Sequence, residues 1–316
     1  MSSLEKVLTS RFLTDTVLSQ ADDVTLMKFR KLNPEWKERI DTSKVLWSRI
    51  IMKTIEKHEE SPDVKRSWTK VLAKMDVPSL RYFAVAVHVY YKTCSRKYCL
   101  MHQRIVPLEK PTYFQQLAQK FKKEKKLKRM TPLHFAVGCD IEGIVEKVVK
   151  LMDWKSPQNS EGLTPLHIAA YENKPRDYEI LIKYADNINP RTYGFFLYTP
   201  LHLAAQAGHL EMCKVIMESL SNKNPQNSNG NTPLHCSVRS KKYDICKYLL
   251  EAGVDREQRN TDGYTALHLA ASKNDYELCK LLVDHGANKE AVIRGKRPYD
   301  LIGKTLAYRK LSKLLK

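Results

Sequence analysis

The 316-residue sequence has no apolar run long enough to span a membrane. Its longest apolar stretch, YFAVAVHVYY at residues 82–91, is about half the length that a transmembrane helix needs. No secretory signal pattern opens the chain either, because Glu5 and Lys6 interrupt the apolar residues and no small-residue cleavage site follows. These absences predict a soluble protein of the cytoplasm or nucleus that makes no membrane contact.

Motifs that would indicate catalysis are also lacking. The sequence contains no glycine-rich phosphate loop, no Gly-x-Ser-x-Gly and no His-Glu-x-x-His. Cys94, Cys99 and His102 lie close together, but tetrahedral zinc needs a fourth ligand that this spacing does not supply. We therefore expect no enzyme activity, no catalytic residues, no metal and no cofactor.

The seven cysteines are an odd number without a compact spacing, which favours a reducing compartment over a disulfide framework. Cys213, Cys246 and Cys279 recur every 33 residues. This regularity indicates a shared structural position, in which a cysteine serves as a small buried apolar residue.

Basic residues are concentrated in the first part of the chain. The net charge is +19, and residues 1–130 carry 28 Lys and Arg against 14 Asp and Glu. The excess peaks in KFKKEKKLKR at 120–129, a run that fits nucleic acid, an acidic partner, an import receptor or a solvated helix end. Few aromatics accompany these charges, so nucleic acid is the least favoured partner. The basic run consists of Lys120, Lys122, Lys123, Lys125, Lys126, Lys128 and Arg129.

A repeat organises the second part of the chain. TPLHFAV, TPLHIAA, TPLHLAA, TPLHCSV and TALHLAA begin at Thr131, Thr164, Thr199, Thr232 and Thr265, and a worn copy, RPYDLIG, begins at Arg297. The spacings are 33, 35, 33, 33 and 32 residues, the self-similarity of a stacked array.

The residue types of the motif suit a short helix pair. Thr is a helix N-cap and Pro suits the first helical position. Gly208, Asn173 and Asn274 stand where the first helix must end in a left-handed residue. A second helix follows, with apolar residues at helical spacing. The pattern over roughly residues 125–316 resembles the ankyrin repeat, which implies helix-turn-helix units with short β-hairpin loops.

The resemblance also assigns the histidines a structural role. In ankyrin repeats the imidazole of the fourth motif position links the helix start to neighbouring turns by hydrogen bonds. That position is held here by His134, His167, His202, His235 and His268. Arg297, Tyr299 and Asp300 depart from the motif, as expected of a C-terminal cap.

One connection between repeats is unusual. From Pro157 to Thr164 and from Pro225 to Thr232 is seven positions, but from Pro190 to Thr199 is nine. The longer connection replaces polar residues with aromatics, and loops on a rigid scaffold often carry binding function. We expect a partner-binding hairpin, unless one or two aromatics, Tyr198 first, fold back over the adjacent repeat. Its aromatics are Tyr193, Phe195, Phe196 and Tyr198.

Residues 1–130 do not repeat and read as a series of helices. Within residues 17–51, Leu26, Trp36, Ile40 and the pair Leu46-Trp47 follow the order that resembles the F-box, without its usual leucine-proline-x-glutamate opening. The alternative is a plain helical cap with core tryptophans. The resemblance implies binding to the adaptor of a cullin-type (SCF) ubiquitin ligase through Val17, Leu18, Leu26 and Phe29.

The sequence thus predicts an all-α protein in three parts: an F-box-like domain at 1–60, a helical linker or N-terminal cap at 61–130, and about five ankyrin repeats with a C-terminal cap at 131–316. The predicted function is non-catalytic substrate recognition in an SCF ligase, with the repeats binding the target. A scaffold or regulatory binding protein with no ubiquitin link is the alternative.

Overall fold

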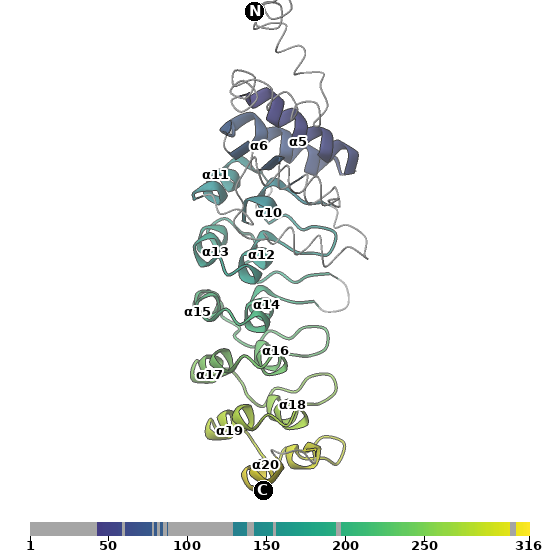
Figure 1. Ribbon diagram of the computed structural model, residues 1–316, viewed down its shortest axis with the longest axis vertical. Coiled ribbons are helices and arrows are strands. Elements are labelled where there is room, and N and C mark those ends of the chain that lie inside the picture. The colour runs from purple at the N-terminus through teal and green to yellow at the C-terminus, as the bar shows by residue number, and fades with distance from the viewer. Residues whose placement is uncertain are drawn as a thin grey trace, which may run out of the picture. The chain divides into compact units, whose positions relative to one another are not determined.

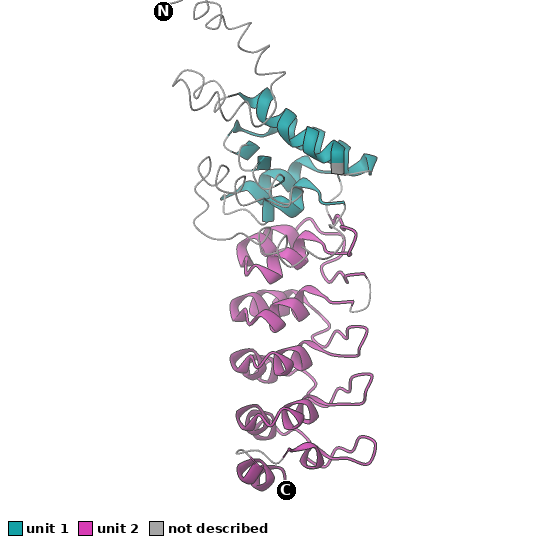
Figure 2. Cartoon of the chain, turned by 45° about the vertical axis from the view of Figure 1, so that its right-hand side comes forward, with its two compact units in different colours: residues 1–153 teal, residues 154–316 magenta. Residues whose placement is uncertain are grey.

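The computed structural model describes residues 43–58, 61–77, 79–80, 83–84, 87, 129–137, 142–153, 156–193, 197–303 and 308–316. The chain divides into two compact units, residues 1–153 and 154–316 (Figure 2). The regular structure in these ranges is helical throughout, and their one β-bridge joins Ile293 to Lys296. None of the helices so described is both long and apolar enough to cross a membrane.

In unit 1, helix α6 covers the first TPLH helix pair. The indole of Trp68 is fully buried, and its Nε1 donates to the main-chain oxygen of Met130 at 3.0 Å. The rings of Phe83 and Phe135 meet the indole edge-on, at centroid distances of 5.6 and 5.5 Å. The tryptophan thereby ties α6 to the residue before the first repeat. The described helices of the unit are α5 (Lys44–His58), α6 (Pro62–Lys74), α10 (Pro132–Val137) and α11 (Ile144–Leu151).

Two ion pairs reinforce this packing at its rim. Lys70 pairs with Asp153, and Lys147 of α11 pairs with Asp76. Burial acts in the opposite direction, but hydrogen bonds from Lys147 and Ser79 hold the pKa of Asp76 well below its usual value. The sequence predicts a helical linker or N-terminal cap over residues 61–130. In the described residues α6 covers the first repeat, and residues 120–128 lie outside them.

Unit 2 is a stack of helix pairs in two columns, α12, α14, α16 and α18 in one and α13, α15, α17 and α19 in the other (Figure 1). A connecting loop projects between successive pairs. The paired helices are α12 (Pro165–Tyr171), α13 (Pro175–Ile182), α14 (Pro200–Ala207), α15 (Leu210–Ser219), α16 (Pro233–Arg239), α17 (Tyr243–Glu251), α18 (Ala266–Ser272) and α19 (Tyr276–Asp284).

The motif residues place these helices as predicted. Thr164, Thr199, Thr232 and Thr265 are N-caps, and Pro holds the first helical position in every copy but the last of these four. Asn173, Gly208 and Asn274 adopt φ of 56°, 94° and 54°, which confirms the predicted left-handed ends. Cys213, Cys246 and Cys279 are completely buried in the second column.

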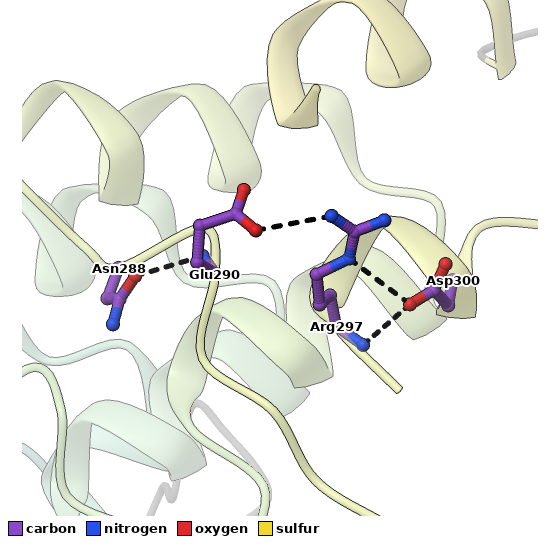
Figure 3. A network of polar contacts seen from close by, with 4 residues as sticks. All are labelled: Asn288, Glu290, Arg297 and Asp300. Carbon is purple, nitrogen blue, oxygen red and sulfur yellow. Dashed lines mark hydrogen bonds and ion pairs between the residues drawn. The ribbon is translucent and has the colours of Figure 1, made fainter. Parts of the chain in front are cut away.

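The worn sixth copy ends the stack with a 3₁₀ turn, η1 (Pro298–Leu301), and helix α20 (Tyr308–Leu315). Asp300 takes over the motif histidine's place, because its Oδ2 accepts from the Arg297 main-chain nitrogen at 2.8 Å. The Arg297 guanidinium bonds Glu290 at 3.2 Å and lies 3.5 Å from Asp300 (Figure 3). A charged network therefore replaces the buried Thr–His pair where the stack meets solvent.

The predicted short β-hairpins do not form strands in the described residues. The loops that begin at Asn159, Asn227 and Asn260 are tight turns with too few ladder positions for a strand pair, and the asparagine side chain adds hydrogen bonds to the main-chain bond that closes each one.

Candidate protein-binding face

Three of the loops between repeats share one turn. In each, an asparagine side chain accepts from main-chain nitrogens two or four residues later, as in the bond from Asn231 N to Asn227 Oδ1 at 3.0 Å. The asparagine nitrogen also donates to the main-chain oxygen four residues on. Each of these three loops, which we call the polar loops, is therefore closed over five residues, from the asparagine to the residue four positions later. The asparagines are Asn159, Asn227 and Asn260.

The aromatic loop closes over seven residues. Thr192 N donates to the main-chain oxygen of Tyr198 at 2.9 Å, and Tyr198 N donates to Thr192 Oγ1 at 2.9 Å. Threonine thus replaces asparagine as the closing residue. The two residues that close this loop lie six positions apart, whereas those of the three asparagine loops lie four apart. We call residues 192–198 the aromatic finger. Its Phe195 and Phe196 lie outside the described residues.

Tyr193 lies on the side of the aromatic finger that meets the preceding loop. Its main-chain nitrogen donates to the oxygen of Glu161 at 2.6 Å, and its hydroxyl bonds the side chain of Gln158. The side chain is still 51% exposed. Tyr193 therefore joins two loops while about half of its side chain stays exposed to solvent.

Tyr198 is more deeply engaged with the stack. Its half-buried ring lies 5.9 Å from the imidazole of His202, and its main-chain oxygen accepts from His167 Nε2 at 3.0 Å. Tyr198 is thus the aromatic that packs on its own repeat, at the base of the aromatic finger.

The motif histidines form a chain of contacts between repeats. In His202, Nδ1 accepts from Thr199 N at 3.2 Å, so Nε2 carries the proton and donates to Asn231 O at 2.8 Å. His235 repeats this pattern with Thr232 and Tyr264. The bonds that the resemblance implied are therefore present in these repeats. At His268, beside the C-terminal cap, Nε2 makes no hydrogen bond to the part of the chain that the structure describes.

The buried motif imidazoles and the Cys213 thiol are poorly suited to acid–base or nucleophilic catalysis. Burial lowers the pKa of His202 to about 4 and also lowers the pKa of His235 and His268, so all three imidazoles are neutral at pH 7. Burial raises the pKa of the Cys213 thiol to about 12. The part of the chain that the structure describes contains no group of three His, Cys, Asp or Glu side chains that could hold a metal.

Several predicted residues cannot be placed. Outside the described residues lie Val17, Leu18, Leu26 and Phe29, the cluster Cys94, Cys99 and His102, and all of the basic run except Arg129. Arg129 is exposed directly before Met130.

Sequence reasoning did not single out Arg191 and Arg239. Both are exposed, and Arg239 ends helix α16. Aligning the repeats with one another would have drawn attention to these two arginines. Arg191 stands where Gln158 and Gln226 stand in the neighbouring loops, and Arg239 occupies the helix-end position held by Tyr171 and Gln206.

Comparison with protein families matches the ankyrin repeat at residues 161–193 and a model of three ankyrin repeats at 201–293. Among curated proteins, the human transient receptor potential cation channel subfamily A member 1 is 31% identical over 122 residues, 36% of this chain and 11% of the channel.

Alpha-latrotoxin-Lh1a of Latrodectus hasselti is 40% identical over 72 residues, and alpha-latrotoxin-Lt1a of Latrodectus tredecimguttatus is 43% identical over 61 residues. These matches cover 23% and 19% of this chain but only 5% and 4% of the toxins. The likeness is thus confined to a small part of each relative. Together with the stacked helix pairs, the family matches identify residues 161–193 and 201–293 as ankyrin repeats.

Proposed function

We propose that this chain is a non-catalytic recognition protein whose ankyrin repeats hold a target protein at the aromatic finger. Ankyrin repeats imply protein–protein interaction, and no enzyme family is indicated. The observation that carries the proposal is the exposed Tyr193, fixed to the preceding loop by its own main chain and hydroxyl. An aromatic held in place by a scaffold loses little conformational entropy on binding.

A pull-down from cell extract with the Phe195→Ser, Phe196→Ser double variant tests the recognition role. We expect loss of captured protein with an unchanged melting temperature. The control is Tyr243→Ser, which removes an exposed tyrosine from the start of α17. If the double variant captures the same proteins as the unaltered chain, the aromatic finger is not the binding site.

We further propose that the target is held for a cullin-type ubiquitin ligase, with residues 1–60 docking the ligase adaptor. The support is the F-box-like order of Leu26, Trp36, Ile40 and Leu46-Trp47 in the sequence. Leu46 and Trp47 are buried in α5, which suits the role of holding a small helical domain together. The repeats would then act by raising the local concentration of target near the ligase.

Co-purification separates this proposal from its alternative. Adaptor and cullin should accompany the unaltered chain and be lost with Leu26→Asp, whereas Lys28→Asp, at a polar position of the same segment, should retain them. If the unaltered chain brings down neither subunit, the chain is a scaffold or regulatory binding protein with no ubiquitin link.

A further inference from the structure

The connections between successive repeats are bonded to one another on the loop side of the stack. We name each connection by the two helices that it links. In the α15–α16 connection, Asn224 Oδ1 accepts from Asp255 N of the next connection at 3.0 Å. Lys223 Nζ donates to the main-chain oxygen of Ala252, at the end of α17, at 3.4 Å. One acceptor and one donor thus reach across to the next repeat.

The same arrangement recurs along the stack. In the α17–α18 connection, Glu257 Oε1 accepts from Asn288 N at 2.8 Å. Its neighbour Arg256 donates from Nε to Gly286 O at 3.0 Å. The α11–α12 connection supplies the acceptor through Ser156 Oγ, which accepts a main-chain N–H of the next connection at 3.1 Å. The acceptor position is therefore bonded in each of these three connections.

The α13–α14 connection is different. Asn189 stands at the acceptor position, but its Oδ1 is buried and has no hydrogen-bond partner in the part of the chain that the structure describes. The matching donor is the nitrogen of Asn222, which is the counterpart of Asp255, because each side chain accepts from the nitrogen two residues later. That nitrogen makes no hydrogen bond to the described residues. Ile188 replaces the basic donor and has no side-chain N–H.

Two further bonds between connections are also missing at this place. Elsewhere, Gln226 Nε2 donates to a glutamine of the next connection at 3.0 Å, and Asn260 Nδ2 donates to Asn231 Oδ1 at 3.1 Å. One repeat earlier, Arg191 replaces Gln226 and Tyr198 replaces Asn231. Arg191 makes no side-chain hydrogen bond to the described residues, and Tyr198 carries no amide oxygen. We call the boundary between the α13–α14 and α15–α16 connections the finger interface.

The helices beside the finger interface pack as they do in the rest of the stack. Helix α14 contacts α12 and α16, and α15 contacts α13 and α17 (Figure 1). His202 also keeps its bond to Asn231 O at 2.8 Å. The missing bonds therefore lie on the loop side. In a repeat protein each repeat contacts only its neighbours, so the interface with the weakest contacts opens most easily.

We propose that the finger interface is a hinge, at which the two connections separate on the loop side while the helix columns act as the pivot. Opening lets water reach Asn189 Oδ1, which removes the cost of burying an unpaired acceptor. The aromatic finger lies on the N-terminal side of the hinge, so bending moves Tyr193 relative to the polar loop at Asn227. A hinge at this place lets the scaffold adjust its curvature to a partner. It requires no particular target, and so goes beyond the proposed function.

Distances between nitroxide labels test the hinge in the full chain. p-Acetylphenylalanine introduced in pairs at loop positions carries the labels and leaves the native cysteines unchanged. The pair at Glu161 and Asn229 spans the finger interface and the bonded interface before it. The pair at Asn229 and Val292 spans two bonded interfaces. Double electron–electron resonance should give a wider distance distribution for the first pair than for the second.

Hydrogen exchange followed by NMR assigns the opening to one interface. The amide of Tyr193 donates to Glu161 O across the preceding interface and should stay protected. Removing bonds elsewhere should create a second hinge. The Lys223→Ala, Asn224→Ala, Gln226→Ala variant should widen the distribution of the second pair, and Asn224→Ala alone should widen it less. Ser221→Ala, at an exposed position of the same connection, is the control and should not change it.

Equal widths for the two pairs in the unaltered chain would overturn the hinge. Rapid exchange of the Tyr193 amide would move the opening to the preceding interface and would also refute the proposal. Circular dichroism and melting verify that the variants fold. If the folded triple variant, or Asn224→Ala where the triple variant does not fold, leaves the second pair as narrow as before, these bonds do not hold the connections together and the proposal is wrong.

Discussion

The imidazole of His202 donates from Nε2 to the main-chain oxygen of Asn231, 2.8 Å away and one repeat further along the stack. Its other nitrogen accepts from the main chain and lies 2.8 Å from the hydroxyl of Thr199. One side chain therefore hydrogen-bonds the start of its own helix and the next loop at the same time. The motif histidine is a structural connector between repeats.

His202→Ala should lower the free energy of unfolding by about 2 kcal/mol or more, because buried polar groups on both sides lose their partner. The urea midpoint of the full chain measures the effect. Gln206→Ala, at an exposed position of the same helix α14, is the control and should change stability little. A variant as stable as the unaltered chain would show that the histidine bonds do not hold the repeats together.

Acid should destabilise the stack between pH 6.5 and 4. The pKa of His202 is lowered on folding, so the unfolded chain binds protons more readily and gains stability relative to the folded chain as pH falls. At pH 5 His202 alone should remove about 2 kcal/mol. His235 and His268 act in the same direction.

Urea midpoints at pH 7.5 and pH 5 measure this dependence, and His202→Gln should show less of it. Asp and Glu side chains contribute little to the change in stability between pH 7.5 and pH 5, because their unperturbed pKa values lie below 5. Equal midpoints at the two pH values would contradict the burial of neutral imidazoles.

Gly162→Ala should displace the aromatic finger. A Cβ at this position would lie 2.3 Å from the main-chain nitrogen of Tyr193, and the backbone φ is +74°. Gly253→Ala is the matched control, since its φ is +75° but no atom lies within 4 Å of the added Cβ. We expect about 1 kcal/mol of destabilisation from left-handed strain in the control and a clearly larger loss at Gly162. Equal losses would mean that the contact with Tyr193 is not rigid.

Trp68 should control how well the first repeat is covered. Trp68→Phe keeps a ring but removes the Nε1 hydrogen bond to the main-chain oxygen of Met130, and should cost about 1–3 kcal/mol. Trp68→Ala also opens a cavity beside Phe83 and Phe135 and should cost about 3–5 kcal/mol. Hydrogen exchange of α10 and α11 reports the loss directly. Unchanged protection in Trp68→Ala would show that α6 is not the cover.

The helix pairs of residues 131–316 could be read from the sequence because their determinants are local and repeated. A threonine cap, a proline at the first turn and a left-handed helix end each act within one turn of chain, and five copies at one period remove ambiguity. The two extra residues of the aromatic loop could be counted from the sequence, because the neighbouring repeats fix the expected loop length. The C-terminal cap followed from the motif positions held by Arg297, Tyr299 and Asp300.

Tertiary structure alone decided which side chains remain available. Tyr193 and Tyr198 look equivalent in the sequence, but one is half exposed and bonded to the preceding loop while the other packs on His202. Arg259 and Arg239 are both exposed arginines, yet Arg259 meets a carbonyl one repeat away and Arg239 meets no partner in the described residues. Such differences depend on contacts across about 30 residues of chain, which local pattern does not encode. The repeat was therefore determined by sequence, and its binding chemistry by the stacking of one repeat on the next.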